Sequence, residues 1–460
     1  MRTLPITLAV LPITLAVLVI PIATPSPAVG QSGLDAQARS RLSITLTGDA
    51  IITHKLSVYE EPEFEQMIGL IRGADAAFTN LEMLFHDFEP YPMYQSGGTW
   101  MRGEPELARE LAWAGFDMVS RANNHTGDYG VEGMRLTTQY VREAGLVQAG
   151  VGESLPAARE ASFLETAKGR IALISLASTF PDHSRASESR GDIPARPGLN
   201  PLRYTTNRFT TPDQIGELRS VLDDMGVPTP GDEQRIRALG TTFLAADEPG
   251  TSTTPDPEDM AAIAAVVNNA SRQADQVIVT IHAHESGASR GEPAEFLVTF
   301  AHAMIDAGAT MFVGHGPHVL RGIEIYKGKP IFYSLGDFIF QNETLLRLPQ
   351  ENYARYDLGP DNHVADFNDS RYNMDESGFP ANPEIWEAVI AIPTFEGSEL
   401  AELTLHPISL GFGEARWVRG RPVLADAALS EHILGYLAER SAPFGTQIDI
   451  ENGVGRVRIR

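Results

Sequence analysis

Residues 314–340 read GHGPHVLRGIEIYKGKPIFYSLGDFIF and combine two histidines with two strand-like runs. The runs are rich in isoleucine, tyrosine and phenylalanine, and Lys327-Gly328-Lys329-Pro330 between them is typical of a turn. His315 and His318 follow a short apolar run at residues 310–313, which is typical of a buried strand. The stretch therefore predicts an antiparallel hairpin that begins a second sheet, next to a strand that ends in imidazole groups.

Upstream of this hairpin, short apolar runs alternate with helical patterns. The strand candidates are residues 43–46, 76–79, 118–120, 171–176, 277–281 and 310–313. This alternation is typical of βαβ units and predicts a largely parallel central sheet. Between the runs, ELARELAWAG at residues 106–115 predicts a helix, with Pro105 in its first turn and Gly115 at its end.

Downstream, two further antiparallel pairs are predicted, turning near Glu396-Gly397 and at Asn452-Gly453. Residues 179–258 differ from the rest, because Pro, Gly, Ser, Thr and charged residues dominate there. They predict a long insertion, which is either a lid or substrate wall or a partly disordered surface excursion. We expect an α/β fold of two packed sheets flanked by helices, with a main domain at residues 31–410 and an extension, 411–460, packing on the same domain.

The composition describes a large acidic protein. Its 460 residues, 43% of them hydrophobic, can bury one large core or two ordinary ones. A formal net charge of -24 argues against a nucleic-acid partner, and it repels anionic substrates unless bound cations reverse the local field. The chain has no cysteine, so any metal must be held by His, Asp, Glu or Asn.

The N-terminus predicts a signal peptide at residues 1–30. Apolar repeats follow Arg2, and small residues lead to a cleavage pattern near Gly30. Pro5, Pro12 and Pro21 interrupt the apolar run, which argues against the alternative of a membrane anchor. We therefore expect the mature chain to be secreted or periplasmic.

Polar residues follow three of the predicted strands in the first half of the chain. Asp49 comes directly after the strand at 43–46, with Gly48 easing the turn. Alternation along the next strand places Asn80 and Glu82 on the same side, where both can face one cation. Asn124, next to His125, follows the strand at 118–120 and offers a neutral oxygen.

Histidines follow two strands in the second half. Residues 277–281 lead into His282, His284 and Glu285, and residues 310–313 lead into His315 and His318. Imidazole is the usual nitrogen ligand of zinc, manganese or iron. Carboxylate, amide and imidazole groups thus recur at the ends of five strands, where α/β folds bind ligands, and this pattern predicts a metal site.

The motifs GDAII, NLE, ANNHTGDYG, HAHE, GHGPHV and GIEIYKGKPIFYSLGDFIF resemble, in kind and order, those of the CapA family of poly-γ-glutamate capsule-synthesis proteins over residues 43–341. That family is similar to the calcineurin-like metallophosphoesterases. The resemblance implies a four-layer αββα sandwich that binds one or two divalent ions, zinc, manganese or iron. The metal-facing positions it implies are Asp49, Glu82, Asn124, His282, His315 and His318. It places His125 beside the leaving group, and Asp128 and Glu285 are the other catalytic candidates.

The chain departs from the pattern of these families at three places. The Asp-x-His signature of phosphoesterases is missing, since His54 lies too far beyond Asp49. His284 and Asp337 stand where relatives commonly have other residues. These departures leave open the number of metal ions and the lining of the pocket.

Two functions are compatible with these features. The first is a metal-dependent hydrolase of phosphoester or γ-glutamyl amide bonds, on a fold that also supports epimerisation. The alternative is a non-enzymatic factor that binds or exports poly-γ-glutamate through metal ions, with a membrane-bound capsule synthase as a candidate partner. Candidate clamps for an anionic polymer are Arg121, Arg196, Arg203 and Lys329, each of which is alternatively an ordinary surface ion pair.

Overall fold

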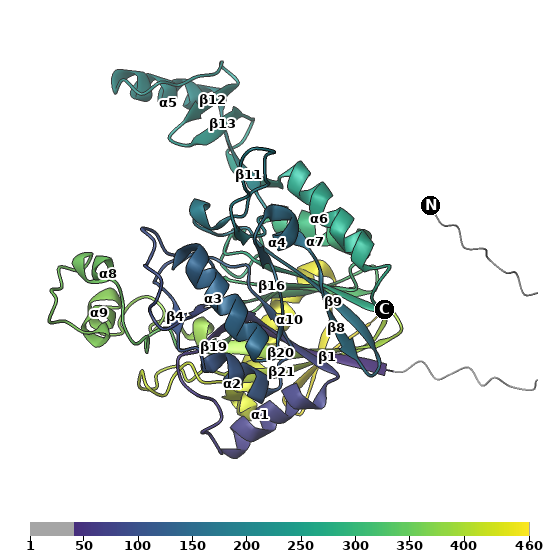
Figure 1. The fold of residues 1–460 in the computed structure, drawn as a ribbon. Helices are drawn as coiled ribbons and strands as arrows, with labels where there is room; N and C mark the ends of the chain where they lie inside the picture. The colour runs from purple at the N-terminus through teal and green to yellow at the C-terminus, as the bar shows by residue number, and fades with distance from the viewer. Residues whose placement is uncertain (1–40, 460) are drawn as a thin grey trace, which may run out of the picture. The chain divides into compact units, whose positions relative to one another are not determined.

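Two large sheets dominate the computed structural model, which describes residues 41–459 (Figure 1). The predicted signal peptide lies outside the described residues. The first sheet has the strand order β23 (Ile448–Glu451), β24 (Val454–Val457), β21 (Glu399–Ser409), β20 (Glu387–Glu396), β1 (Arg41–Ile51), β2 (Ala76–Leu81), β5 (Met118–Ser120), β6 (Val147–Ala149), with β19 (Asp337–Phe340) beside β1 and β22 (Val423–Leu424) beside β21. The second has the order β17 (Leu320–Tyr326), β18 (Lys329–Leu335), β16 (Met311–His315), β15 (Gln276–His282), β9 (Gly169–Ala177), β8 (Ser162–Thr166).

The predicted strands exist, but they divide between the two sheets. The runs of β1, β2 and β5 belong to the first sheet, whereas those of β9, β15 and β16 belong to the second. The prediction of one central parallel sheet is therefore wrong, and the hairpin at β17 and β18 completes the second sheet instead of beginning it. Each run is apolar along its length, as is typical of a strand buried on both faces, and that pattern carries no signal for the choice of sheet.

The predicted hairpins are confirmed. Lys327 and Gly328 join β17 to β18 with φ angles of 50° and 76°, and Asn452 and Gly453 join β23 to β24 with 52° and 77°. Two consecutive positive φ angles match the twist of the flanking strands, which explains why these dipeptides could be recognised locally. The pair β20 and β21 turns at Gly397, as expected.

The two sheets pack face to face. Ile44 and Leu46 of β1 are fully buried in the same apolar cluster as Ile278 of β15 and Met311 of β16. Thr45, between the two β1 residues, points to the other face and donates to Leu70 O of a helix. This alternation gives β1 one face toward the second sheet and one toward the helices.

Helices cover both outer faces and make four layers, αββα. On the first sheet, α1 (Pro62–Gly73), α2 (Leu107–Ala114) and α3 (Gly130–Glu143) contribute to one apolar cluster. On the second, α6 (Pro257–Ala270) and α7 (Glu295–Asp306) contribute to another. No helix within residues 41–459 is both long enough and apolar enough to span a bilayer.

Residues 179–258 have regular structure of their own. They contain η1 (Asp182–Ser184), β10 (Gly198–Leu199), α5 (Pro212–Asp224) and a sheet of β12 (Arg235–Ala238), β13 (Thr241–Ala245), β11 (Tyr204–Thr210) and β14 (Gly250–Pro255). Thr211 caps α5 with its side chain. The small sheet is joined to α7 because Phe296 N donates to Thr253 Oγ1 over 3.0 Å.

Residues beyond 410 also pack on the main body. Helix α10 (Ala427–Ser441) places Ile433, Leu434 and Leu437 in the cluster between the sheets. Its last residue, Ser441, accepts a hydrogen bond from Ile323 N of β17 over 2.9 Å. The helix therefore closes one side of the central core.

Candidate metal centre

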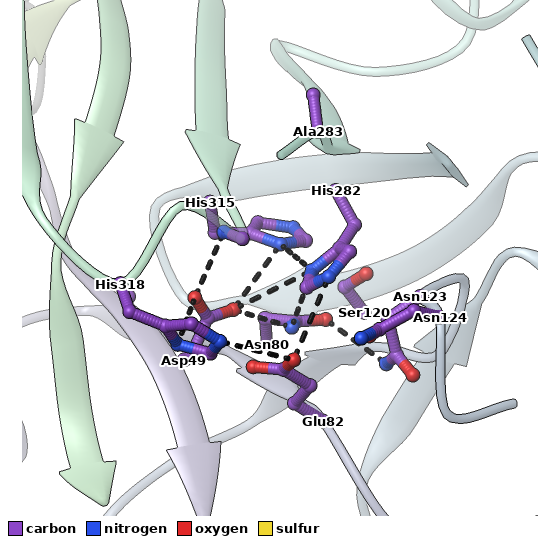
Figure 2. Close-up of polar contacts among 12 residues, drawn as sticks. Asp49, Asn80, Glu82, Ser120, Asn123, Asn124, His282, Ala283, His315 and His318 are labelled. Carbon is purple, nitrogen blue, oxygen red and sulfur yellow. Dashed lines mark hydrogen bonds and ion pairs between the residues drawn. The ribbon is translucent and has the colours of Figure 1, made fainter. Parts of the chain in front are cut away.

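The candidate site lies at the carboxyl ends of strands from both sheets (Figure 2). Asp49 of β1 is in register with Asn80 of β2 and with Asp337 of β19. In the second sheet, His282 of β15 is in register with His315 of β16. Parallel strands end at the same edge of a sheet, so strand pairing alone gathers these side chains.

Strand β1 reaches this edge because residue 48 is glycine. A Cβ on Gly48 would lie 1.7 Å from Gly336 O, and Asp49 N donates to the same carbonyl over 3.1 Å. Gly48 lies within β1, so the prediction that it eases a turn is corrected. It allows a close approach of two backbones, which holds Asp49 beside the segment that leads to Asp337.

The first group of candidate ligands is Asp49, His282 and His315. Asp49 Oδ1 lies 3.4 Å from His315 Nδ1 and 3.6 Å from His282 Nδ1, and the two Nδ1 atoms are 3.0 Å apart. Ligands held about 2.0–2.1 Å from a tetrahedral metal are themselves roughly 3.4 Å apart. The spacing of these three atoms therefore fits one cation.

The remaining contacts of Asp49 fix its carboxylate. Asn80 Nδ2 donates to Asp49 Oδ1 over 2.7 Å, and Gly316 N donates to Oδ2 over 2.8 Å. Asn80, which the sequence placed toward the cation, thus orients Asp49 in this structure. Asn123 lies behind it and donates to Leu81 O over 2.7 Å.

The second group is Glu82, His284 and His318, whose ligand atoms all lie within 4.8 Å of one another. Glu82 Oε1 is 3.9 Å from His318 Nε2 and 3.6 Å from His282 Nε2. His318 Nδ1 donates to Asp337 Oδ1 over 2.8 Å, which leaves Nε2 as its free ligand atom. The ligand atoms of a third combination also lie within 4.8 Å of one another: Asp49, Glu82, His318 and Asp337.

Burial sets the charge of these groups. It lowers the pKa of His282 to about 4 and the pKa of His284 well below its ordinary value, so both rings are neutral and can act as ligands. Burial, followed by the charges of Asp49 and Asp337, raises the pKa of Glu82 well above its ordinary value. Burial alone would raise the pKa of Asp49 too, but the neighbouring imidazoles of His282 and His315 hold it well below its ordinary value.

Unsatisfied oxygens provide the test of whether a metal fits. Glu82 is fully buried, and neither of its carboxylate oxygens has a hydrogen-bond partner among the described residues. Within the same part of the chain, Asp337 Oδ2 and Asn124 Oδ1 are likewise buried without a partner. A buried carboxylate without compensation costs several kcal/mol. A divalent ion of the zinc, manganese or iron class would satisfy these oxygens and the neutral imidazoles together.

His125 lies beside the second group with its orientation fixed. Its Nδ1 donates to Asp128 Oδ2 over 2.7 Å, and its Nε2 is 3.8 Å from Glu82 Oε1. Asp128 in turn accepts hydrogen bonds from Gly97 N and Met101 N, each over 2.8 Å. The pair is thus anchored at the carboxylate, and the free nitrogen of the ring faces the centre.

The other predicted site residues differ in their placement. Asn124 lies beside the cluster (Figure 2), and its Nδ2 donates to Gly97 O over 3.0 Å. Glu285 accepts hydrogen bonds from Ser178 Oγ over 2.7 Å and Thr179 Oγ1 over 2.9 Å. These bonds hold Glu285 against the β9 end of the second sheet.

The structure does not bring the predicted arginine clamps to the cluster. Arg121 is buried, donates to Gln148 Oε1 over 2.7 Å, and has its pKa lowered by burial to about 9. Arg196 donates to Arg185 O over 2.9 Å, and Arg203 donates to Asp259 Oδ2 over 2.7 Å. These contacts engage each guanidinium within the protein, and the assignment of the three arginines to substrate binding stays a prediction. Lys329 likewise pairs with Glu399 at 3.8 Å.

Sequence reasoning missed His284 and Asp337 as candidate ligands. Both follow the end of a strand through irregular backbone: His284 N donates to Thr179 Oγ1 over 2.9 Å, and Asp337 follows Gly336, whose φ is 76°. The alternation of side chains along a strand therefore cannot predict the direction in which these two side chains point. The only available signal was their acidic or imidazole chemistry next to residues already predicted as ligands.

Comparison with known proteins gives the family. Residues 43–342 match the family described as bacterial capsule synthesis protein PGA_cap. The uncharacterized protein y4sH of Sinorhizobium fredii is 40% identical over 433 residues, which cover 91% of this chain and 93% of that protein.

Two more distant relatives carry functional names. The capsule biosynthesis protein CapA of Bacillus anthracis is 24% identical, and the PGA biosynthesis protein CapA of Bacillus subtilis is 26% identical. Each alignment covers 65% of this chain, and the chain spans 60% and 63% of those two proteins. Because the family match extends over well over half of the residues, the chain belongs to the PGA_cap family of bacterial capsule synthesis proteins.

Proposed function

We propose that this chain is a secreted, metal-dependent hydrolase of capsule metabolism that cleaves a phosphoester or a γ-glutamyl amide bond. The observation that carries the proposal is Glu82, a fully buried carboxylate with both oxygens unpartnered among the described residues, beside neutral imidazoles. A purely structural cluster would satisfy its buried acids with donors. Here Glu82 has no donor, and one of its oxygens lies within 4.8 Å of imidazole nitrogens of His284 and His318.

The residues that would hold the metal are Asp49, His282 and His315 in one group and Glu82, His284 and His318 in the other. When bound there, a divalent ion supplies Lewis-acid chemistry and an activated water near neutral pH. Asn124 Oδ1 and Asp337 Oδ2 offer further oxygens at the rim of the groups.

His125 provides the proton for the leaving group. Its Nδ1 is committed to Asp128 at 2.7 Å, so the proton to be transferred sits on Nε2, on the side of the centre. As the bond to the leaving oxygen or nitrogen breaks, that atom takes the Nε2 proton and the ring becomes neutral. The Asp128 carboxylate stabilises the imidazolium before transfer and keeps the ring oriented.

The acidic charge of the chain fits a requirement for metal. With a net charge of -24, the protein repels anionic polymers at long range, and Asp49, whose pKa is held low, adds negative charge at the centre. Bound cations reverse the local field. We therefore propose that metal is needed for binding as well as for turnover, and that a membrane-bound capsule synthase is the partner that makes the polymer.

The test begins with elemental analysis of the purified mature chain. Phosphatase and γ-glutamyl hydrolase assays follow on metal-loaded and chelated protein, with Glu82→Gln as the matched variant. The proposal expects bound metal and turnover that chelation and Glu82→Gln abolish. Metal-dependent binding of a poly-γ-glutamate oligomer without turnover of either substrate would instead favour a non-enzymatic binding or export factor.

Secretion has its own test. Mass spectrometry of the native N-terminus should find a chain that begins near Gln31 outside the cytoplasm. An intact Met1 in a fraction that only detergent extracts would contradict it.

A further inference from the structure

A cavity of about 550 Å³ opens beside the candidate metal centre. Three segments far apart in sequence form it: the loop from Tyr94 to Trp100, the residues from Thr179 to Pro181, and Arg355. Asn124 also lines it and connects it to the centre. Asn124 Oδ1 is buried and has no hydrogen-bond partner among the described residues. The cavity is therefore an extension of the candidate site.

The loop of the cavity is held in a fixed position relative to the catalytic pair. Gly97 N donates to Asp128 Oδ1 over 2.8 Å, and Gly97 O accepts from Asn124 Nδ2 over 3.0 Å. A Cβ on Gly97 would lie 2.6 Å from Asn124 O, so a side chain there would force the two segments apart. A ligand in the cavity thus lies against the same loop that orients His125.

The opposite wall is fixed through Thr179. Its hydroxyl accepts from His284 N over 2.9 Å and contacts Glu285 Oε1 at 2.9 Å. The wall is therefore tied to a candidate metal ligand, and Phe180 next to it adds an aromatic surface.

Arg355 is the one charged side chain that lines the cavity. It is exposed and has no carboxylate partner among residues 41–459. Nearby arginines are paired: Arg416 Nε lies 3.1 Å from Glu343 Oε1, and Arg419 Nε donates to Glu343 Oε2 over 2.6 Å. In a chain of net charge -24, an unpaired guanidinium at the mouth of a cavity is available to an anionic ligand.

The segment that carries Arg355 is firmly attached. Arg355 caps α8 (Gln350–Ala354), which precedes α9 (Val364–Arg371) (Figure 1). Asn368 Nδ2 of α9 donates to Glu343 O over 2.8 Å, and Arg371 of α9 donates to Thr99 Oγ1 in the cavity loop. These two contacts of α9 hold the backbone of the segment that carries Arg355 in place.

We propose that this cavity is the subsite for an extended polyanionic substrate, and that Arg355 binds a carboxylate of the chain next to the bond at the metal centre. The identity of the ligand as a γ-glutamyl polymer rests on the proposed function. The planar fork of arginine matches a carboxylate with two parallel hydrogen bonds. In this proposal the exposed ring of Tyr94, which lines the cavity, packs against the part of the polymer between two successive carboxylates.

The experiment measures binding to the metal-loaded full chain, so that it does not depend on turnover. A short poly-γ-glutamate oligomer, its carboxyl-methylated form and inorganic phosphate are titrated into wild type, Arg355→Gln and Arg347→Gln. Arg347 is the matched control, because it is exposed on the same segment but stacks on Phe88 instead of lining the cavity. Arg355 is exposed, so its replacement leaves the core intact.

Arg355→Gln should weaken binding of the oligomer about ten- to a hundred-fold, as is typical for a lost charge-assisted pair, and Arg347→Gln should not. The methylated oligomer should bind wild type as weakly as the free oligomer binds Arg355→Gln. Phosphate should bind wild type and Arg355→Gln equally, because it binds at the metal centre and does not reach the cavity. Equal affinity of wild type and Arg355→Gln for the oligomer, equal losses in both variants, or a matching loss for phosphate would each overturn the proposal. Arginine-dependent binding without turnover would support the subsite while contradicting the hydrolase.

Discussion

His315 Nε2 lies 2.9 Å from Thr280 Oγ1, and that hydroxyl donates its own proton to Val313 O, also over 2.9 Å. The hydroxyl has a single hydrogen, so toward His315 it can only accept. The proton of the neutral ring must therefore sit on Nε2. A threonine that contacts no candidate ligand atom thus directs the lone pair of His315 Nδ1 at Asp49 and His282.

This relationship predicts that Thr280→Val weakens metal binding. The substitution keeps the shape but removes the acceptor, and loss of such a supporting hydrogen bond typically lowers metal affinity about ten- to a hundred-fold. Competition with a chelator of known affinity measures the change. The control is Thr45→Val, which removes a part-buried hydrogen bond from a threonine hydroxyl to Leu70 O on the helix-covered face of β1. If both variants bind metal like wild type, Thr280 does not set the tautomer.

His125→Ala should reduce turnover and leave the metal in place. Loss of a general acid typically costs about a hundred- to ten-thousand-fold in rate. Elemental analysis and kcat on the same preparation separate the two effects. A variant that purifies without metal would show that His125 Nε2, 3.8 Å from Glu82 Oε1, is itself a ligand.

Glu82→Gln should have different effects on the stripped and the loaded protein. Without metal, burial raises the pKa of Glu82 and favours its neutral form, so the neutral amide should change the free energy of unfolding little. With metal at a hundred times its Kd, wild type should gain about 2.7 kcal/mol, and the variant should gain far less. Thermal unfolding with and without metal measures both. A variant that gains as much stability from metal as wild type does would contradict the assignment of Glu82 as a ligand.

His86 predicts a pH dependence of stability away from the metal centre. Burial lowers the pKa of His86 to about 4, below its value of about 6.5 in an unfolded chain. The unfolded state therefore binds the proton first, so the contribution of His86 is intact above pH 6.5 and is lost as the pH falls toward 4. Between pH 7.5 and 5.5 the loss should be about 1.4 kcal/mol.

Denaturant unfolding of wild type and His86→Gln at the two pH values isolates this group. The difference in unfolding free energy between the two proteins should shrink or reverse by that amount at the lower pH. Parallel pH profiles would mean that the ring of His86, stacked edge-on against Tyr129, is already solvated.

The sequence predicted those parts of the site that regular strands deliver. Asp49, Glu82, His282 and His315 each end or directly follow a recognisable apolar run, and parallel pairing brings such ends together whichever sheet they join. The division of the strands between two sheets did not matter for this gathering, because both sheets end at the same site.

The remaining parts depend on contacts between distant segments. His284 is oriented by Thr179, and the segment that carries Arg355 is attached through Asn368 and Glu343, across separations that no local pattern encodes. The same holds for the contacts of the arginines predicted as clamps. Whether a guanidinium is free or paired depends on which acids the fold brings near it, and Asp259 at the start of α6 pairs with Arg203.

Gly97 sets a limit on how this protein can be re-engineered. A methyl group at this position would press on the backbone of Asn124, whereas a Cβ at Gly98, one residue along in the same loop, meets nothing within 4 Å. Libraries aimed at new polymers can therefore vary position 98 freely, while any change at 97 also displaces the anchor of Asp128. A change at Gly98 can therefore alter substrate selectivity without disturbing proton transfer by His125, whereas a change at Gly97 alters both.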